Sequence, residues 1–193
     1  MISIIKKFRE ELLILKAQDI IIRYWILNSF DSILVMIGIL VGAFLSKDIT
    51  RELVIDVGIA SALAMFVSGF FGAYTTEQAE SYKEINEIEK AMLKKLEGKL
   101  FKGAKKEVPL ITALSNGLSP LFNSLIILIP FFMKGFFGVK NAFYASMTIA
   151  ITLLFVIGCY LGKISRKNII MNGFKVIIIA IVAIVLIYII NMI

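Results

Sequence analysis

Five long apolar segments constrain this chain more than any other feature of its sequence. They lie at about residues 20–45, 53–74, 108–133, 142–162 and 171–191. A helix rises about 1.5 Å per residue, so roughly 20 residues cross the hydrocarbon core of a bilayer, which is about 30 Å thick. Hydrophobic residues make up 59% of the chain, more than soluble globular domains use. We therefore predict an all-α integral membrane protein with five transmembrane helices.

The distribution of the net charge of +7 predicts the orientation of these helices. With five spans, 17 of the 21 Lys and Arg residues fall on the side of the N-terminus, and four fall on the other side. The positive-inside rule places the richer side in the cytoplasm. The N-terminus and the segment 75–107 are then cytoplasmic, and the C-terminus is outside. The basic excess therefore needs no nucleic-acid partner.

The segment 1–19 precedes the first span and differs from it in composition. Charged residues are interspersed along this segment, so it lacks the uncharged core of a signal peptide. Ile5, Phe8, Leu12 and Leu15 recur at helical spacing opposite those charges. This pattern predicts an amphipathic helix that lies on the membrane surface and anchors there through its apolar face and through lipid contact.

The second apolar segment continues without a proline or a turn cluster into the acidic sequence TTEQAESYKEINEIEK. We expect a cytoplasmic helix within 75–107 that ends near Gly98 or Gly103. The helical repeat places four carboxylates of this segment on one stripe: Glu77, Glu80, Glu84 and Glu87. Two interpretations remain open, a solvated helix with salt bridges to neighbouring lysines or a site that binds cations.

Asp31 lies near the middle of the first span, at about the depth of the bilayer midplane. A charge at that depth costs about 2.5–3.5 kcal/mol, so an acid in the membrane is a functional-site hypothesis by default. The alternative is a structural Asp that is protonated or paired with Asn28. Gly38 and Gly42 lie on the same face of the helix and form a surface that another helix can approach closely.

Met65 in the second span lies at about the same depth as Asp31 if Glu77 marks the cytoplasmic surface. A carboxylate and a thioether at one level suit a transition-metal ion, because sulfur disfavours Mg²⁺ and Ca²⁺. A lone methionine in an apolar helix more often serves packing. Beside it, a ridge of small residues predicts close helix packing: Ala60, Ala64, Ser68 and Gly72.

The third span is the most polar of the five. Four polar residues share one face of the helix: Thr112, Asn116, Ser119 and Asn123. Pro120 lies on this face and frees a backbone carbonyl. A polar stripe of this kind faces a partner helix or a water-lined path. The chain has one cysteine and no histidine, so any metal ligands must be carboxylates, methionines, amides or hydroxyls.

Motifs in all five spans fit one pattern. Arg23 precedes Asp31 by eight residues and GILVGA follows, while the second span reads ALAMFVSGFFGAYTTEQAE. The third reads PLITALSNGLSPLFNSLIILIPFF, and the last two read LFVIGCYLGKISRKNIIMNGFKVIIIAIVAIVLIYII. Together these motifs resemble the vacuolar iron transporter family, which includes fungal and plant vacuolar iron importers and many prokaryotic relatives. The resemblance extends over essentially the whole chain.

The resemblance implies a homodimer of five-helix subunits with the translocation path at the dimer interface. It implies that a cytoplasmic region between spans 2 and 3 delivers Fe²⁺ or related divalent ions to that path in exchange for protons. By position, Asp31 and Met65 match membrane metal ligands of the family, and the four glutamates fall where its cytoplasmic carboxylates begin. The cytoplasmic insert is shorter than the three-helix metal-binding domain of the family.

Three positions depart from the family pattern. Tyr24, Ser32 and Val57 stand where relatives often have an Asp, a Gly and a membrane Glu. Asp56, next to Val57, is a candidate to replace that missing acid. These departures bear on proton coupling and on the identity of the metal.

We therefore predict a transporter that moves Fe²⁺ or Mn²⁺ out of the cytoplasm across the plasma membrane of a prokaryote. It is expected not to be an enzyme and to hold no permanently bound cofactor, with Asn116, Asn123 and Asp56 lining the path. A lipid-modifying enzyme would need clustered Asp/Arg or His motifs at the membrane surface, which the sequence lacks. A scaffold or metal sensor that does not transport remains the alternative.

Overall fold

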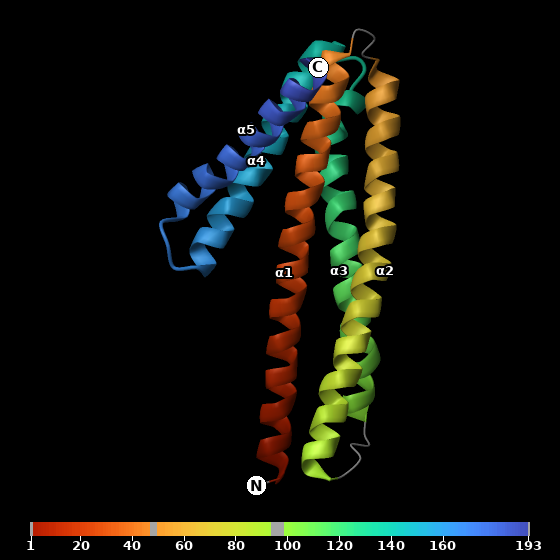
Figure 1. Cartoon of the computed structure of the whole chain (residues 1–193), viewed down its shortest axis with the longest axis vertical. Coiled ribbons are helices and arrows are strands. Elements are labelled where there is room, and N and C mark those ends of the chain that lie inside the picture. Colours follow the sequence, from red (N-terminus) through yellow and green to blue (C-terminus); the bar gives the residue numbers. More distant parts are fainter. Residues whose placement is uncertain (1, 47–49, 94–98, 193) are drawn as a thin grey trace. The chain divides into compact units, whose positions relative to one another are not determined.

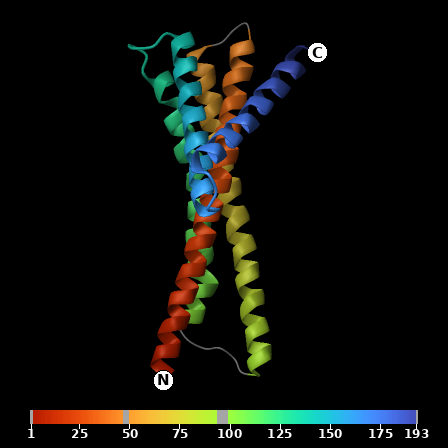
Figure 2. The same ribbon diagram turned by 90° about the vertical axis from the view of Figure 1, so that its left-hand side faces the viewer.

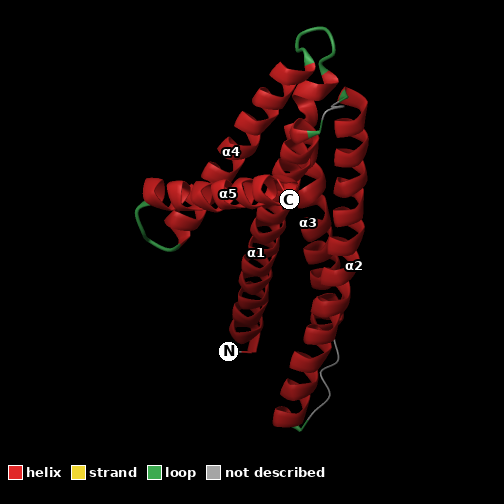
Figure 3. Cartoon of the chain, turned by 45° about the horizontal axis from the view of Figure 1, so that its top comes forward, coloured by secondary structure: helices red, strands yellow, loops and turns green. Residues whose placement is uncertain are grey.

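The computed structural model describes residues 2–46, 50–93 and 99–192, with side chains described for 18–46, 50–93 and 106–190. Within these residues the chain forms helices and no strands (Figures 1 and 3). The helices are α1 (Ile2–Leu45), α2 (Arg51–Met92), α3 (Lys99–Phe132), α4 (Val139–Ile164) and α5 (Ile169–Met192). All five are long and apolar enough to cross a membrane. The predicted all-α fold with five spans is therefore confirmed.

Helix α1 continues without interruption through the predicted boundary at residue 19 (Figure 2). The sequence explains this continuity, because no proline or glycine precedes Gly38. The predicted surface segment and the first span thus form one helix. The contact of 1–19 with the membrane surface stays a prediction.

Helix α2 runs unbroken from the apolar segment into the acidic segment, as the absence of turn residues predicted. It ends at Met92, so the prediction of an end near Gly98 or Gly103 was wrong. Leu93 adopts a left-handed backbone conformation with φ 50°, and its N–H donates to the Lys90 carbonyl at 3.3 Å. This tight turn closes the helix. Gly103 lies inside α3 instead.

The chain divides into two compact units, which are described separately. The first unit contains Met1–Asn28 and Phe66–Ser119, and therefore the N-terminal part of α1, the C-terminal part of α2 and the N-terminal part of α3. The second unit contains Ser29–Met65 and Pro120–Ile193, including all of α4 and α5.

The second unit has the larger apolar core. Its fully buried side chains come from α1, α2, α3 and α4 and include Ile33, Met36, Ile37, Leu40, Val54, Ile127, Leu128, Phe131 and Leu154. Helices α4 and α5 pack backbone against backbone where Gly158 faces Gly173. A Cβ atom at Gly158 would lie 2.8 Å from the Asn172 oxygen and 2.8 Å from the Gly173 Cα. Small residues in α4 therefore allow α5 to pack closely against it.

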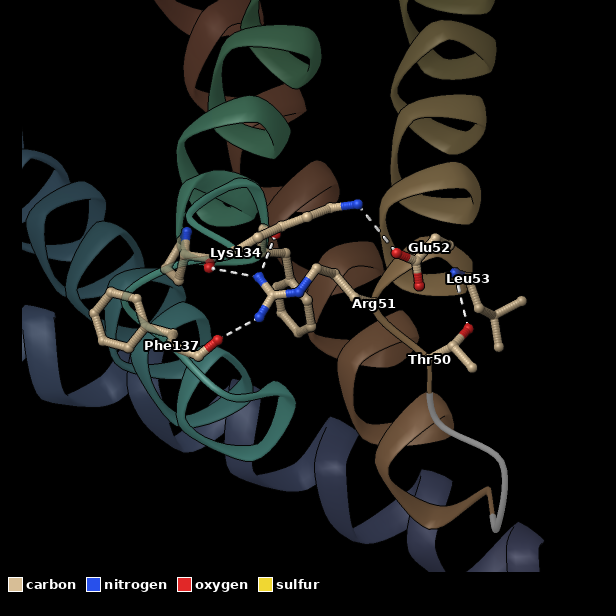
Figure 4. Close-up of polar contacts among 8 residues, drawn as sticks. Thr50, Arg51, Glu52, Leu53, Lys134 and Phe137 are labelled. Carbon is tan, nitrogen blue, oxygen red and sulfur yellow. Dashed lines mark hydrogen bonds and ion pairs between the residues drawn. The ribbon is translucent and has the colours of Figure 1, made fainter.

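One end of the second unit is held by polar contacts between the start of α2 and the end of α3 (Figure 4). The buried Arg51 guanidinium donates to the carbonyl oxygens of Phe131 at 2.5 Å and Pro130 at 3.3 Å, and also to that of Phe137. The next residue, Glu52, pairs with Lys134 at 3.2 Å in an exposed salt bridge. Arg51 satisfies carbonyls that the end of α3 leaves without helical donors.

Candidate functional site

A polar junction joins three helices inside the first unit. The Asn28 Nδ2 group of α1 donates to the backbone oxygen of Asn116 in α3 at 2.8 Å and also contacts the Asn116 side-chain oxygen. The Asn116 Nδ2 group donates to the Gly69 carbonyl of α2 at 2.8 Å. Pro120 explains the first bond. It has no N–H to donate to the carbonyl four residues earlier, so the Asn116 carbonyl accepts from Asn28 instead.

The polar face of α3 continues this junction along α1. The Ser119 hydroxyl donates to the Trp25 carbonyl at 2.8 Å, and the Ser115 hydroxyl donates to the Ile21 carbonyl at 3.3 Å. The polar stripe was predicted to face either a partner helix or a water-lined path. At Asn116 and Ser119 the structure shows contacts with partner helices. Asn123 belongs to the second unit and is also buried. The role of the two asparagines in lining a path stays a prediction.

Glu77 is the most buried of the four carboxylates in the acidic stripe, with 4% of its surface exposed. Its Oε1 atom is buried and has no hydrogen-bond partner among the described residues. The Tyr24 side chain of α1 lies close enough to Glu77 to interact with its carboxylate, and the Arg23 guanidinium lies 5.7 Å from the Tyr24 ring centroid. Tyr24 stood out in the sequence only as a departure from the family pattern, so its contact with Glu77 was not predicted.

The remaining carboxylates differ from Glu77 because of their angles on the helix. At about 100° per residue, Glu84 falls within about 20° of Glu77, while Glu80 and Glu87 are rotated about 60–80° away. Burial follows these angles, since Glu84 is partly buried and Glu80 and Glu87 are exposed. The apolar residues of this segment divide in the same way, since Ile85 is buried while Ile88 and Met92 are exposed. The stripe of four glutamates thus has a more buried edge, formed by Glu77 and Glu84, and an exposed edge, formed by Glu80 and Glu87.

Asp31 is exposed on α1, although it lies inside an apolar span. The next residue, Ser32, is fully buried and donates to the Ser29 carbonyl at 2.9 Å. Asn28 pairs with Asn116, so the alternative pairing of Asp31 with Asn28 does not form in the described part of the chain. Hydrocarbon is a poor environment for such a carboxylate.

The small-residue ridge of α2 is exposed as well. Each of its four members is exposed: Ala60, Ala64, Ser68 and Gly72. A Cβ atom at Gly72 or at Gly42 of α1 would meet no described atom within 4 Å. The ridge was predicted to pack closely against another helix, and within the described residues no helix of this chain covers it in that way.

The predicted ligand Met65 and the predicted path-lining residue Asp56 both lie on α2. Met65 is partly buried, while Asp56 and Val57 are both exposed. Among the described residues there is no group of three or more His, Cys, Asp or Glu side chains able to hold a metal ion. Asp31, Met65 and Asp56 belong to the second unit, and the four glutamates belong to the first. The assignment of Asp31, Met65 and the four glutamates as metal-binding residues stays a prediction, and so does the role of Asp56 in lining the path.

Five apolar helices with buried polar junctions and an acid inside a span define an integral membrane protein of the polytopic class. A model of the VIT family matches residues 88–192. The chain is also 33% identical over 159 residues to an uncharacterized protein of Methanocaldococcus jannaschii, and the match covers 80% of each chain. The chain belongs to the VIT family, which confirms the family resemblance of its motifs. It is therefore a membrane metal ion transporter, in a family of transporters rather than enzymes.

The family match covers the end of α2 and all of α3, α4 and α5. Asp31, Met65 and the stripe from Glu77 to Glu87 lie before its first residue. The family assignment therefore establishes the class of transporter, while the roles of these particular side chains depend on their chemistry and positions.

Proposed function

We propose that this protein carries Fe²⁺ or Mn²⁺ out of the cytoplasm along a path that passes Asp31. The observation that carries this proposal is the exposed carboxylate of Asp31 within an apolar span. A group that is costly to place in lipid is retained where it has a function or a covering partner. In a family of metal ion transporters, Asp31 can serve to bind the transported ion. The positive charge of the bound ion then balances the charge of the carboxylate.

A second copy of the chain supplies the cover that Asp31 needs. One subunit offers no cluster of three acidic, histidine or cysteine ligands in its described residues, whereas a twofold axis doubles every ligand near it. Two copies of Asp31 and Met65 provide two carboxylates and two thioethers. The exposed ridge with Gly72 adds a smooth surface for close helix packing between subunits. We therefore place the path at the interface of a homodimer.

The ligand types favour a borderline transition metal over Mg²⁺ or Ca²⁺. Carboxylate oxygen binds many divalent ions, but a thioether contributes little to hard cations. In this proposal the exposed Glu80 and Glu87 collect the ion, and the less exposed Glu84 and Glu77 bind it next, with Glu77 nearest the apolar part of α2. The buried Oε1 atom of Glu77, which has no described partner, is the atom best placed to bind an arriving cation.

In this proposal Asp56 is the residue that takes part in proton exchange. Val57 replaces the acid that relatives often have in the second span, and Asp56 is exposed one position earlier. Adjacent residues on a helix point about 100° apart. The Asp56 side chain therefore points in a different direction from a carboxylate at position 57. We propose that Asp56 exchanges the proton, and that Asp56→Asn abolishes the response of metal flux to an imposed pH gradient.

The proposal is tested by Fe²⁺ and Mn²⁺ flux into proteoliposomes that contain the full chain. Asp31→Asn and Met65→Leu preserve side-chain size and should each lower flux strongly, while Glu80→Gln alone should have a small effect because Glu87 remains. Glu89→Gln, on the same helix but outside the stripe, is the matched control. Unchanged flux in the Asp31→Asn, Met65→Leu double variant would overturn the assigned path.

The same preparations separate a transporter from a scaffold or sensor that only binds metal. Saturable flux into the vesicle lumen requires transport. A sensor binds only as many metal ions as it has sites, and no metal accumulates in the lumen. Binding without accumulation in the wild-type protein would reject the ion-specific proposal and favour the sensor.

A further inference from the structure

The turn between α4 and α5 is drawn as a short green connection in Figure 3. A patch of exposed basic side chains lies at and near this turn. The patch consists of Lys163, Arg166, Lys167 and Lys175, all exposed. None of the four forms an ion pair in the described part of the chain. The sequence contains no Asp or Glu after residue 107, so α4 and α5 themselves offer no carboxylate to neutralise the patch.

The backbone of this turn is fixed on its α4 side by a Schellman motif. The Lys167 N–H donates to the Gly162 carbonyl at 3.0 Å, and the Arg166 N–H donates to the Lys163 carbonyl at 3.2 Å. Arg166 therefore occupies the left-handed position of the motif, with φ 53°. Glycine is preferred there because other residues are strained. This chain instead holds a long cationic side chain at the tip of the hairpin.

The α5 side of the turn is equally well defined. The Asn168 side-chain oxygen accepts a hydrogen bond from the Met171 N–H at 3.3 Å and caps the helix. A Cβ atom at Gly162 would lie 3.0 Å from the Ile169 Cα, so the two backbones are in close contact next to the turn. The basic side chains thus project from a backbone that is held on both sides.

Apolar side chains extend up to the basic patch on both helices. Ile164 is 57% exposed, and Ile170 is 62% exposed. Tyr160, one turn before the end of α4, is also exposed, and tyrosine is enriched where membrane helices meet the headgroups. The patch therefore lies where apolar surface for acyl chains gives way to a polar surface, which is the level of lipid phosphates. Lys175 lies deeper, and its long side chain can extend to the same level.

We propose that the α4–α5 turn binds the phosphate groups of anionic phospholipids. Unpaired cationic side chains supply the attraction for the phosphate, and the adjoining apolar surface supplies contacts for the lipid tails. This second contribution favours a lipid over a free anion. The proposal does not depend on which ion the protein carries.

The test uses the purified full chain in detergent, titrated with phosphatidylglycerol and with phosphatidylcholine and analysed by native mass spectrometry. Wild-type protein should bind phosphatidylglycerol more tightly than phosphatidylcholine. The variant Lys163→Gln, Arg166→Gly, Lys167→Gln should bind phosphatidylglycerol about tenfold more weakly or worse, since each basic residue near a lipid surface contributes several-fold. Lys140→Gln, at the opposite end of α4, is the control and should leave binding unchanged.

Arg166→Gly alone is the control for misfolding of the triple variant. Glycine suits the left-handed position, so this variant should keep the melting temperature of the wild type. It should still weaken phosphatidylglycerol binding several-fold. Equal binding of the two lipids by the wild type, unchanged phosphatidylglycerol binding in the triple variant, or displacement of the lipid by inorganic phosphate would each overturn the proposal.

Discussion

The Asn116 side-chain amide donates a 2.8 Å hydrogen bond to the Gly69 carbonyl oxygen and so joins α3 to α2 within the first unit. A small residue at position 69 makes this contact possible. A Cβ atom there would lie 3.1 Å from the Asn28 Nδ2 atom and 3.3 Å from the Asn116 carbonyl oxygen. Asparagine and glycine therefore act together at one crossing, in the way that polar and small residues commonly join membrane helices.

Replacing Asn116 with alanine should destabilise the folded protein. The substitution removes the donor to Gly69 and the side-chain contact with Asn28, and hydrogen bonds between membrane helices contribute about 0.6–1.7 kcal/mol. The change should appear as a lower melting temperature in detergent. Asn141→Ala provides the control, because Asn141 is exposed at the start of α4. Equal melting temperatures for the two variants would contradict this role for Asn116.

A double-mutant cycle tests the link between Pro120 and Asn28. In Pro120→Ala, the new backbone N–H can donate to the Asn116 carbonyl and satisfy it within α3. Asn28→Ala should then cost less stability in the Pro120→Ala background than in the wild type, by about 0.5 kcal/mol or more. Melting curves of the four proteins give the coupling. Strictly additive effects would show that the proline and the asparagine act independently.

Arg51→Met should reduce stability more than removal of the neighbouring salt bridge. The guanidinium is buried and its three bonds go to carbonyls, so its loss leaves acceptors without donors and should cost about 1.5–3 kcal/mol. Lys134→Gln breaks only an exposed pair with Glu52 and should change the melting temperature little. The opposite order of the two effects would refute the importance of this helix-end contact.

Gly158→Ala should disrupt the α4–α5 hairpin. The added methyl would meet backbone atoms at 2.8 Å, which cannot move aside as a side chain can, and overpacking of this kind costs about 1–3 kcal/mol. Gly135→Ala is the control, since its Cβ would meet no described atom within 4 Å. Thermal unfolding monitored by intrinsic fluorescence measures both, and similar melting temperatures would argue against tight packing at Gly158.

Hydropathy and helical periodicity were sufficient to predict the five spans, because membrane insertion requires long apolar helices whatever their partners. The polar stripe of α3 and the carbonyl freed by Pro120 were also visible in the sequence. The choice of Asn28 as the group that satisfies this carbonyl was not, since it depends on how α1 and α3 meet. Helical angle likewise predicts the stripe of glutamates but not which edge is buried.

The end of α2 shows where sequence reasoning failed. Glycines at 98 and 103 suggested a helix end, yet the helix closes at Leu93, a residue with no preference for a left-handed conformation. The proposed approach of a second copy to Asp31 also cannot be derived from the apolar pattern, because a lipid-facing and a subunit-facing position look alike in one chain.

The unbroken acidic end of α2 has a kinetic consequence for an ion that binds there. Successive carboxylates from Glu77 to Glu87 are three or four residues apart, so each step along the helix axis is only about 4.5–6 Å. On the proposed path, an ion that leaves one carboxylate would reach the next before it regains a complete hydration shell in bulk water. Inserting a single residue between Glu80 and Glu84 would rotate the outer pair by about 100° and interrupt this succession without removing any charge.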